Sequence, residues 1–515
     1  MNENGRLDPV TLSVLASALA GVAEEMGAVL IRGAYSSNIK ERRDCSTAIF
    51  DERGRMVAQA EHIPVHLGAM PEAVAAVMRR DPRPGDVFAI NDPYSGGTHL
   101  PDITLVSPIS YEEDILGFAV TRAHHSDVGG MRPGSMPSDS REVYQEGIII
   151  PPVRMVQGGE YVQDVLDLLL ANVRTPAIRR GDLRAQIAAN NIAEERIAEL
   201  IERRDKETVL AAFDEVISYA EKRTREAVRE LPDGEYSAED VMEGDGIVDE
   251  DIQIKATVTV EEGSMSIDFS GTAEAVRGNV NCPLPVTRSA CYFALRVLLP
   301  KDILANAGTY APLEIKAPEG SLVNARSPSA VVAGNVETSN RIADAVLAAF
   351  ASFAPEEVPA QGQGTMNNTI IGGPGWTYYE TIGGGQGASS KGPGPSGVHV
   401  GMSNTLNTPI EAFELEYPMR VERYELLYES GGAGENRGGD GVVRSVKVLE
   451  PASLSLLTDR RRHPPRGANG GEAGAVGENL LNDEDLPPKV SRELEEGDVL
   501  AVRTPGGGGY GQRVE

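Results

Sequence analysis

The stretch from Asn91 to Gly130 constrains the fold of this 515-residue chain more than any other part. Two apolar runs, 103–108 and 117–121, are separated by a short polar insert, which predicts neighbouring strands joined by a hairpin. Polar residues gather at the ends of these runs among glycine-rich turns, and they include three of the seven histidines. Such a gathering at strand ends is typical of a functional site rather than of a core.

The spacing of these polar residues predicts that they meet. His99 and Asp102 lie on an extended segment, because Pro101 prevents a helix, and His124 follows the second strand. Two imidazoles and a carboxylate suit Zn, Mn or Fe, and an ion with an open position would be a Lewis acid or a source of hydroxide. A His/Asp acid–base site without a metal, or structural hydrogen bonding, fits the same residues. His125 should point to the opposite face of the strand from His124.

A long loop rich in Pro, Gly and Ser follows, from Met131 to Pro152. Loops of this length inside compact domains are typically functional lids or disordered segments, and the position directly after the histidines favours a lid. Glu142, Tyr144 and Glu146 are its polar candidates, although a solvated loop would explain them equally well.

Composition and charge narrow the class of protein. Lys and Arg number 48 against 77 Asp and Glu, so the net charge of −29 argues against binding to nucleic acid or to an anionic membrane surface. Three scattered cysteines are too few for a disulfide framework, which favours a reducing cytoplasm. The uncharged run 9–23 has no basic segment before it, so we expect a helix capped by Asp8 and ending near Arg32, not a signal peptide or membrane span.

The remaining patterns predict a mixed α/β (α+β) protein with several layers. An amphipathic helical pattern continues over residues 183–220, and the composition changes at 231–234. We therefore expect a metal-site part ending in long helices (1–232), a strand-rich part with one helix (233–330) and a Gly-rich, β-rich C-terminal part (331–515).

Glycine-rich segments mark the C-terminal part. The segment Glu380–Glu411 offers many backbone N–H groups, which would suit phosphate or carboxylate oxygens, although a flexible surface loop is the simpler interpretation. Ser430–Arg444 and Thr504–Gly511 are expected to form hairpin turns. No GxxxxGK[ST] motif for ATP occurs in the sequence.

Several long strings, in order, give the sequence a family resemblance. They are IKERRDCSTAIFD, HIPVHLGAMPEAV, NDPYSGGTHLPDITLVSP, RAHHSDVGGMRPGSMP, EGIIIPP, GDLRAQIAANN, ETIGGGQGA and SNTLNTPIE. With these strings the chain resembles the hydantoinase B/oxoprolinase family over about residues 8 to 512.

The resemblance implies a subunit of an ATP-dependent enzyme that opens cyclic amides such as hydantoins, 5-oxoproline or lactams. In that family ATP is bound by a hydantoinase A-type partner, which phosphorylates the substrate, and this division of labour implies a hetero-oligomer. The resemblance also implies a divalent metal held by Glu41, His99, Asp102 and His124. Spacing alone indicates a surface ion-pair patch around Glu41.

Three residues are acid–base candidates beside these ligands: His125, Asp127 and Glu146. A subunit of an ATP-dependent ketone carboxylase is the alternative function within the resemblance. A non-catalytic scaffold for the A-type partner is a further alternative.

Overall fold

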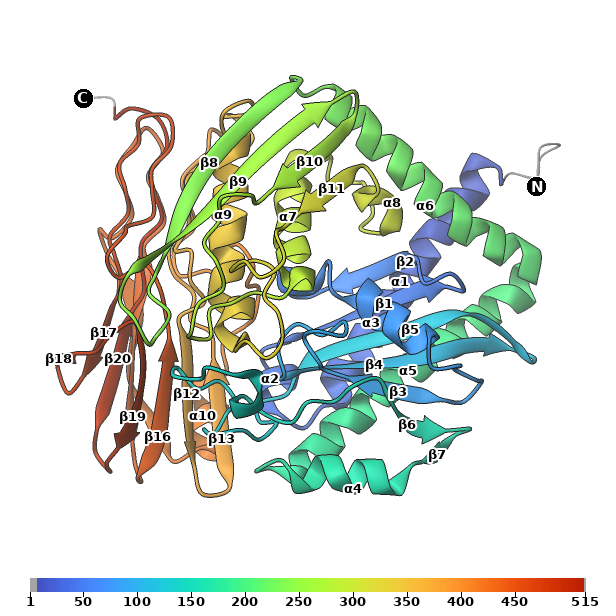
Figure 1. Ribbon diagram of the computed structural model, residues 1–515, viewed down its shortest axis with the longest axis horizontal. Coiled ribbons are helices and arrows are strands. Elements are labelled where there is room, and N and C mark those ends of the chain that lie inside the picture. The colour runs from blue at the N-terminus through green and yellow to red at the C-terminus, as the bar shows by residue number, and fades with distance from the viewer. Residues whose placement is uncertain (1–6, 514–515) are drawn as a thin grey trace.

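A seven-stranded sheet forms the N-terminal part of the computed structural model, which describes residues 7–513 (Figure 1). Its strand order is β2-β1-β5-β4-β3-β6-β7. The strands are β1 (Cys45–Asp51), β2 (Met56–Glu61), β3 (Val87–Ile90), β4 (Asp102–Tyr111), β5 (Asp114–His124), β6 (Val153–Gln157) and β7 (Glu160–Tyr161). β4 and β5 pair antiparallel, with Asp102 opposite His124, so the hairpin predicted from the two apolar runs is confirmed.

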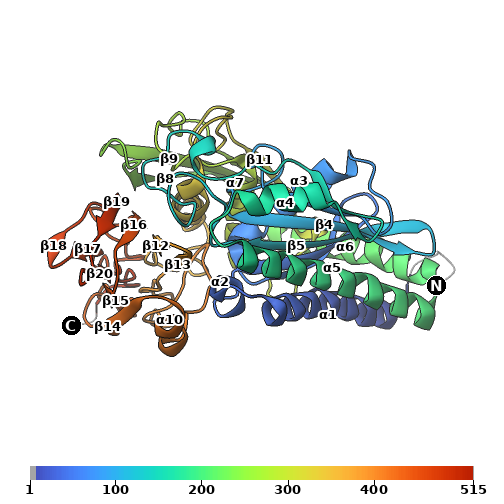
Figure 2. The same cartoon turned by 90° about the horizontal axis from the view of Figure 1, so that it is seen from below.

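Helices cover both faces of this sheet. α1 (Pro9–Gly33) and α5 (Pro176–Arg204) lie side by side on one face (Figure 2), and α3 (Met70–Met78) packs on the other. The other N-terminal helices are α2 (Ser37–Lys40), η1 (Pro64–His66), η2 (Val143–Gln145), α4 (Gln163–Ala171) and α6 (Lys206–Arg229). α5 and α6 confirm the helices predicted over residues 183–220. α6 buries an apolar face as predicted, whereas the buried face of α5 includes the polar residues Asp182, Gln186 and Asn190.

The apolar N-terminal run forms α1, and Asp8 caps it as expected, accepting hydrogen bonds from the N–H groups of Val10 and Thr11. Among residues 7–513, α1 is the one helix with the length and hydropathy of a membrane span. Its buried face, from Leu15 to Leu30, packs instead against α5 and the sheet. The helix is therefore part of the core.

Side chains of β4 and β5 alternate between the two faces of the sheet up to the irregularity at Ile109/Ser110, as the period of a strand requires. Ile103 and Leu105 pack in the cluster that contains Leu183 of α5. Val106 and Val120 point the other way, into the large central core. Asp102 and His124 share the central face with these two valines, because each lies an even number of residues from them.

A four-stranded sheet and its helices form the middle layer. The strand order is β11-β10-β9-β8, and the strands are β8 (Gly234–Glu243), β9 (Asp251–Glu261), β10 (Ser264–Asp268) and β11 (Leu313–Lys316). The helices are α7 (Leu284–Leu298), α8 (Ala307–Tyr310), the π-helix η3 (Gly334–Thr338) and α9 (Ser339–Phe350). α9 packs on α7, β8 and β9, so residues 334–350 lie with the middle layer rather than with the C-terminal sheets.

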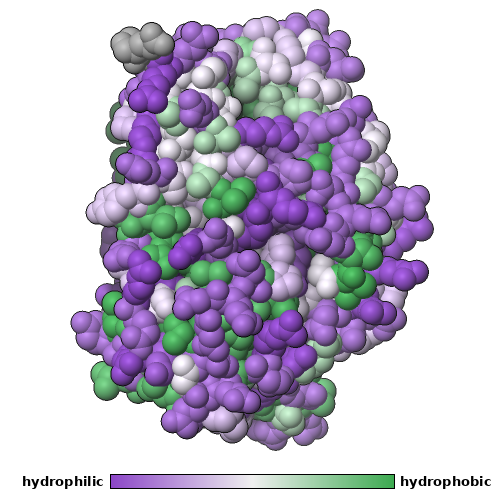
Figure 3. All heavy atoms as spheres, turned by 90° about the vertical axis from the view of Figure 1, so that its left-hand side faces the viewer, coloured by the Kyte–Doolittle hydropathy of each residue, from purple (hydrophilic) through white to green (hydrophobic). Residues whose placement is uncertain are grey.

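Two further sheets confirm the β-rich C-terminal part. Their orders are β13-β12-β16-β19 and β14-β15-β20-β17-β18. The elements are β12 (Asn368–Gly373), β13 (Trp376–Glu380), α10 (Ile410–Glu416), β14 (Met419–Leu427), β15 (Gly441–Val448), β16 (Ala452–Leu457), β17 (Glu478–Leu481), β18 (Glu484–Asp485), β19 (Lys489–Leu494) and β20 (Val499–Arg503). The side of the molecule that carries these sheets is mostly hydrophilic, with small separate hydrophobic areas (Figure 3), as the high charge content leads one to expect.

The glycine-rich segments pack against one another. Ser430–Arg444 connects β14 to its antiparallel neighbour β15, as the predicted hairpin turn requires, whereas Thr504–Gly511 follows β20 without forming a hairpin turn. The N–H of Gly385 donates to Pro505 O, that of Gly507 to Gly439 O, and that of Gly439 to Gln386 O. A Cβ at Gly507 would lie 2.0 Å from Gln386 O, so glycine is required by the close approach. Within Glu380–Glu411 the N–H groups of Gly384, Gly385, Gln386 and Ala388 all donate to backbone carbonyls. The anion-binding and flexible-loop expectations for this part of the segment are therefore both wrong.

Candidate metal centre

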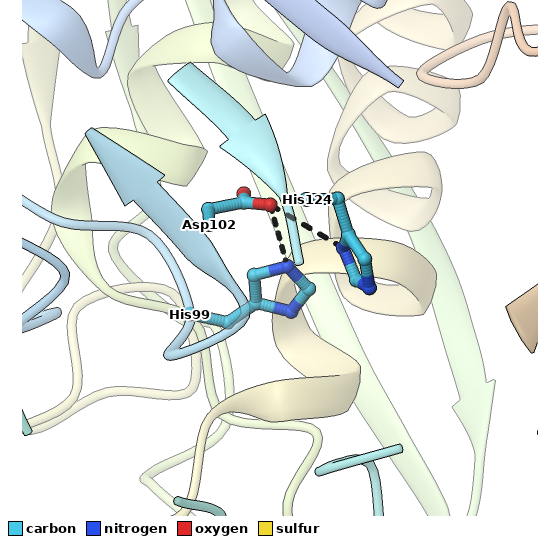
Figure 4. Close-up of side chains that lie close together, drawn as sticks. All are labelled: His99, Asp102 and His124. Atoms are coloured by element: carbon cyan, nitrogen blue, oxygen red, sulfur yellow. Dashed lines mark ion pairs between the residues drawn. The ribbon is translucent and has the colours of Figure 1, made fainter. Parts of the chain in front are cut away.

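Three side chains converge at the end of the β4–β5 hairpin (Figure 4). Asp102 Oδ1 lies 3.0 Å from His99 Nε2 and 3.4 Å from His124 Nδ1. One ligand atom from each residue lies within 4.8 Å of the others, and all three residues are buried. The structure thus brings together the His-x-x-Asp pair and the third residue that the spacing predicted to meet.

The tautomer of His99 makes this point of convergence suited to a cation. Its Nδ1 lies 3.3 Å from the carbonyl oxygen of Val332, which can only accept, so Nδ1 carries the hydrogen. In the neutral ring Nε2 then carries a lone pair, which faces the Asp102 carboxylate. Nε2 has no hydrogen-bond partner. Two electron pairs at 3.0 Å repel each other unless a proton or a cation lies between them.

The electrostatics of the other two residues agree with that arrangement. Burial alone would raise the pKa of Asp102, but the neighbouring His99, His124 and His66 hold it well below its usual range. Burial lowers the pKa of His124, so its imidazole is neutral near pH 7. His124 Nε2 is buried without a hydrogen-bond partner. A carboxylate together with two imidazoles is a donor set that fits Zn, Mn or Fe.

Further residues contact the cluster, most of them from distant segments that the spacing did not predict. His66 Nε2 lies 3.5 Å from Asp102 Oδ2, and Thr98 donates to the same oxygen at 2.7 Å. Asn335, from the π-helix η3, donates to it at 3.4 Å. Tyr379 stacks on the His124 ring with 4.5 Å between centroids. The string HIPVHLG was a signal for His66, whereas nothing in the sequence pairs residues 335 or 379 with this hairpin.

The structure does not bring Glu41 into the cluster of ligand atoms. Glu41 is half-buried at the C-terminal end of α2 and lies near Glu416, whose pKa rises through burial and through the charge of Glu41. The same string carries Asp44, which is buried. Its carbonyl oxygen accepts from the N–H of His124 at 3.1 Å, and its charge raises the pKa of His124.

Glu146, from the loop after the histidines, is linked to the cluster through the backbone of one residue. Its carboxylate accepts from the N–H groups of Val331 and Val332 and from Ser140 Oγ. Val332 also holds His99 through its carbonyl oxygen, so a single residue connects Glu146 to the cluster. Burial raises the pKa of Glu146 to about 7. The carboxyl can therefore gain and lose a proton near neutral pH, which an acid–base group requires.

The other two acid–base candidates have different surroundings. His125 lies on the α5 side of the sheet, as its position predicted, and its Nε2 donates to Gln186 Oε1 at 2.9 Å. Burial lowers its pKa to about 4. Asp127 accepts four hydrogen bonds, from the N–H groups of Gly129, Gly134 and Arg174 and from the Arg174 guanidinium. Asp127 thus organises the loop, while Glu142 and Tyr144 are exposed.

Relatives of known sequence match nearly all of this chain. It is 42% identical to the uncharacterized protein MJ0963 of Methanocaldococcus jannaschii over 99% of this chain and 92% of that protein. It is 40% identical to 5-oxoprolinase 1 of Arabidopsis thaliana, over 98% of this chain but only 42% of that protein. It is 35% identical to the B component of a putative D-/L-hydantoinase from Pseudomonas sp., over 99% of this chain and 91% of that protein.

Solved structures share the fold. The ATP-dependent caprolactamase from Pseudomonas jessenii superposes with a TM-score of 0.91 at 29% identity, over 98% of this chain and 91% of that chain. An acetone carboxylase superposes with a TM-score of 0.88 at 18% identity, over 98% of this chain and 76% of that chain, which shows the fold alone. The Hydantoinase B/oxoprolinase family profile matches residues 8–513, and the chain belongs to that family.

Proposed function

We propose that this chain is the metal-bearing B-type subunit of an ATP-dependent hydrolase that opens cyclic amides. The observation that carries the proposal is the buried convergence of His99, Asp102 and His124 on one point, with two imidazole nitrogens that lack hydrogen-bond partners. The similarity to an ATP-dependent caprolactamase and to 5-oxoprolinases supports the substrate class. No P-loop motif occurs in this chain, so we assign ATP to an A-type partner in a hetero-oligomer, which we expect in the cytoplasm.

The proposed reaction divides the chemistry between the two subunits. The partner transfers a phosphoryl group from ATP to the amide oxygen, and the activated ring then enters this subunit. There the ring takes up two water molecules, the C–N bond breaks, and the open-chain amino acid and inorganic phosphate are released. A bound divalent cation would supply Lewis acidity and lower the pKa of water at this point.

The side chains of this subunit have separate parts in the proposal. His99, Asp102 and His124 would hold the cation, with Glu41 as the further ligand that the family pattern implies. Glu146 would take a proton from the attacking water and return it to the leaving nitrogen, since its pKa is near 7. The burial of the cluster keeps bulk water from the activated ring.

Co-expression with the A-type partner tests the proposal. Metal content and ATP-dependent phosphate release would be measured for wild type, His99→Ala and His124→Ala with hydantoin, 5-oxoproline and caprolactam. Both variants should lose the metal and turnover. His463→Ala is the matched control, because His463 is partly exposed and pairs with Asp251 far from the cluster in sequence. Full metal content and full turnover in both cluster variants would refute the proposal.

Two alternatives give different outcomes in the same assay. Turnover of acetone only in the presence of bicarbonate, without any amide turnover, would identify a ketone carboxylase. Undiminished turnover after replacement of all four proposed ligands would identify a scaffold for the partner. The metal content of Glu41→Gln tests whether Glu41 is the fourth ligand. Loss of metal in this variant would place Glu41 in the coordination sphere.

A further inference from the structure

Arg122 is a buried arginine whose guanidinium is only partly used. It is completely buried, and its Nε donates to Thr104 Oγ1 at 2.8 Å. Its Nη2 donates to the carbonyl oxygens of Gly96 and Ala69 at 3.2 and 3.4 Å. Its Nη1 is buried without a hydrogen-bond partner. An unpaired buried donor on a charged group is costly to leave unsatisfied, so Nη1 of Arg122 is available to a ligand.

The strand register places Arg122 beside the proposed metal centre. In the register of β4 and β5, Arg122 lies opposite Thr104 and His124 lies opposite Asp102. These two pairs of opposite residues are neighbours on the same face of the sheet. Alternate residues of one strand lie about 7 Å apart on the same side of a sheet. The carbonyl of Gly96, which Arg122 holds, belongs to the turn that leads to Thr98 and His99. The guanidinium therefore lies on the face and at the end of the hairpin where the cluster forms.

The guanidinium of Arg122 carries the positive charge that recognition of an anion requires. Burial lowers the pKa of Arg122 to about 10, and the Asp102 charge opposes that change, so the guanidinium stays positive at neutral pH. A buried cationic group with an unpaired N–H is stabilised by an anionic partner.

A second buried arginine provides a contrast within the same region. Arg42 is also completely buried, but all three of its nitrogens donate to protein oxygens, namely Leu406 O, Tyr379 O, Thr381 Oγ1 and Thr405 Oγ1. Arg42 thus links residues 379–381 and 405–406 of the C-terminal part to the N-terminal part through hydrogen bonds. Arg122 differs because it keeps one donor group free.

We propose that Arg122 binds the phosphoryl group of the activated substrate through its free Nη1 and retains inorganic phosphate after ring opening. The proposal rests on the proposed function and deepens it, because it names the residue of this subunit that recognises the phosphoryl group of the activated ring. Arginine suits this task because its planar donors match phosphate oxygens.

Calorimetric titration of the Mn²⁺-loaded full-length chain with inorganic phosphate tests this binding without turnover. We expect wild type to bind phosphate, Arg122→Met to bind it at least about tenfold more weakly, and Arg122→Lys to bind it with intermediate affinity. Arg154→Met is the matched control, since Arg154 pairs with Asp86 at the sheet edge and should leave phosphate affinity unchanged. Bicarbonate in place of phosphate should bind more weakly.

Several results would overturn the inference. They are absence of phosphate binding to the loaded wild type, equal phosphate affinity in wild type and Arg122→Lys, or tighter binding of bicarbonate than of phosphate. Because wild type and Arg122→Lys suffice for these comparisons, misfolding of Arg122→Met does not prevent a decision. If the complex turns over a cyclic amide but wild type and Arg122→Lys bind phosphate equally, the role of Arg122 is rejected and the proposed function stands. If phosphate binding depends on Arg122 but the complex shows no ATP-dependent amide turnover, the proposed function is rejected and the phosphate-binding role of Arg122 stands.

Discussion

Replacement of Glu146 by Gln should change how the stability of the metal-free chain depends on pH. Burial raises the pKa of this carboxyl from 4.5 to about 7. Between these two values the unfolded chain has lost the proton while the folded chain still holds it, so stability falls as the pH rises through this window. At 1.36 kcal/mol for each pKa unit, the fall attributable to Glu146 is about 3 kcal/mol. Glu146→Gln cannot ionise and should lack this contribution.

Urea unfolding at pH 5 and pH 8, after removal of metal with a chelator, measures the effect. Other carboxyl groups with a raised pKa, such as Glu337 with a pKa of about 8, are present in both proteins, so their contributions to the pH dependence cancel in the comparison. Glu160→Gln makes the same change of charge at an exposed position and should keep the wild-type pH dependence. An identical loss of stability between pH 5 and pH 8 in wild type and Glu146→Gln would refute the assignment of Glu146 as a buried carboxyl protonated below pH 7.

Three more predictions concern the metal, the glycine-rich packing and the cysteines. Asp102→Asn removes the anionic ligand and should weaken Mn²⁺ binding by more than about tenfold in a calorimetric titration, and unchanged affinity would argue against the centre. Gly507→Ala should cost several kcal/mol of stability or prevent folding, whereas Gly21→Ala, with no heavy atom within 4 Å of the added Cβ, should gain up to about 1 kcal/mol in urea unfolding. The three cysteines are free and buried, and burial raises the pKa of each thiol. A thiol reagent at neutral pH should therefore modify none of them in the native chain and all three after denaturation.

Glu41 shows where a family pattern and a side-chain position differ. The pattern assigns it to the metal, but in the structure its carboxylate stays outside the cluster and beside Glu416. Its segment nevertheless lies against the end of β5, because Asn38 Nδ2 donates to the carbonyl oxygen of His124 at 2.9 Å. The metal content of Glu41→Gln therefore separates a ligand from a neighbouring surface carboxylate.

Local patterns in the sequence determined the parts of this protein that depend on neighbours along the chain. The two apolar runs and the polar insert between them predicted β4 and β5, and the proline after the glycine-rich turn kept His99 and Asp102 out of a helix. The strand period also separated the two adjacent histidines correctly, with His124 on the cluster and His125 on Gln186. These residues are close in sequence, or lie in strands joined by a short turn, so their geometry follows from backbone rules.

Only the tertiary structure decided what surrounds these residues. The imidazole of His66, the amide of Asn335 and the ring of Tyr379 come from three separate layers, and no period in the sequence relates them. The glycine-rich segments could not be assigned for the same reason, since their N–H groups donate to carbonyls far away in the chain. The protonation of Glu146 and the free donor of Arg122 likewise result from burial, which depends on the packing of the whole fold.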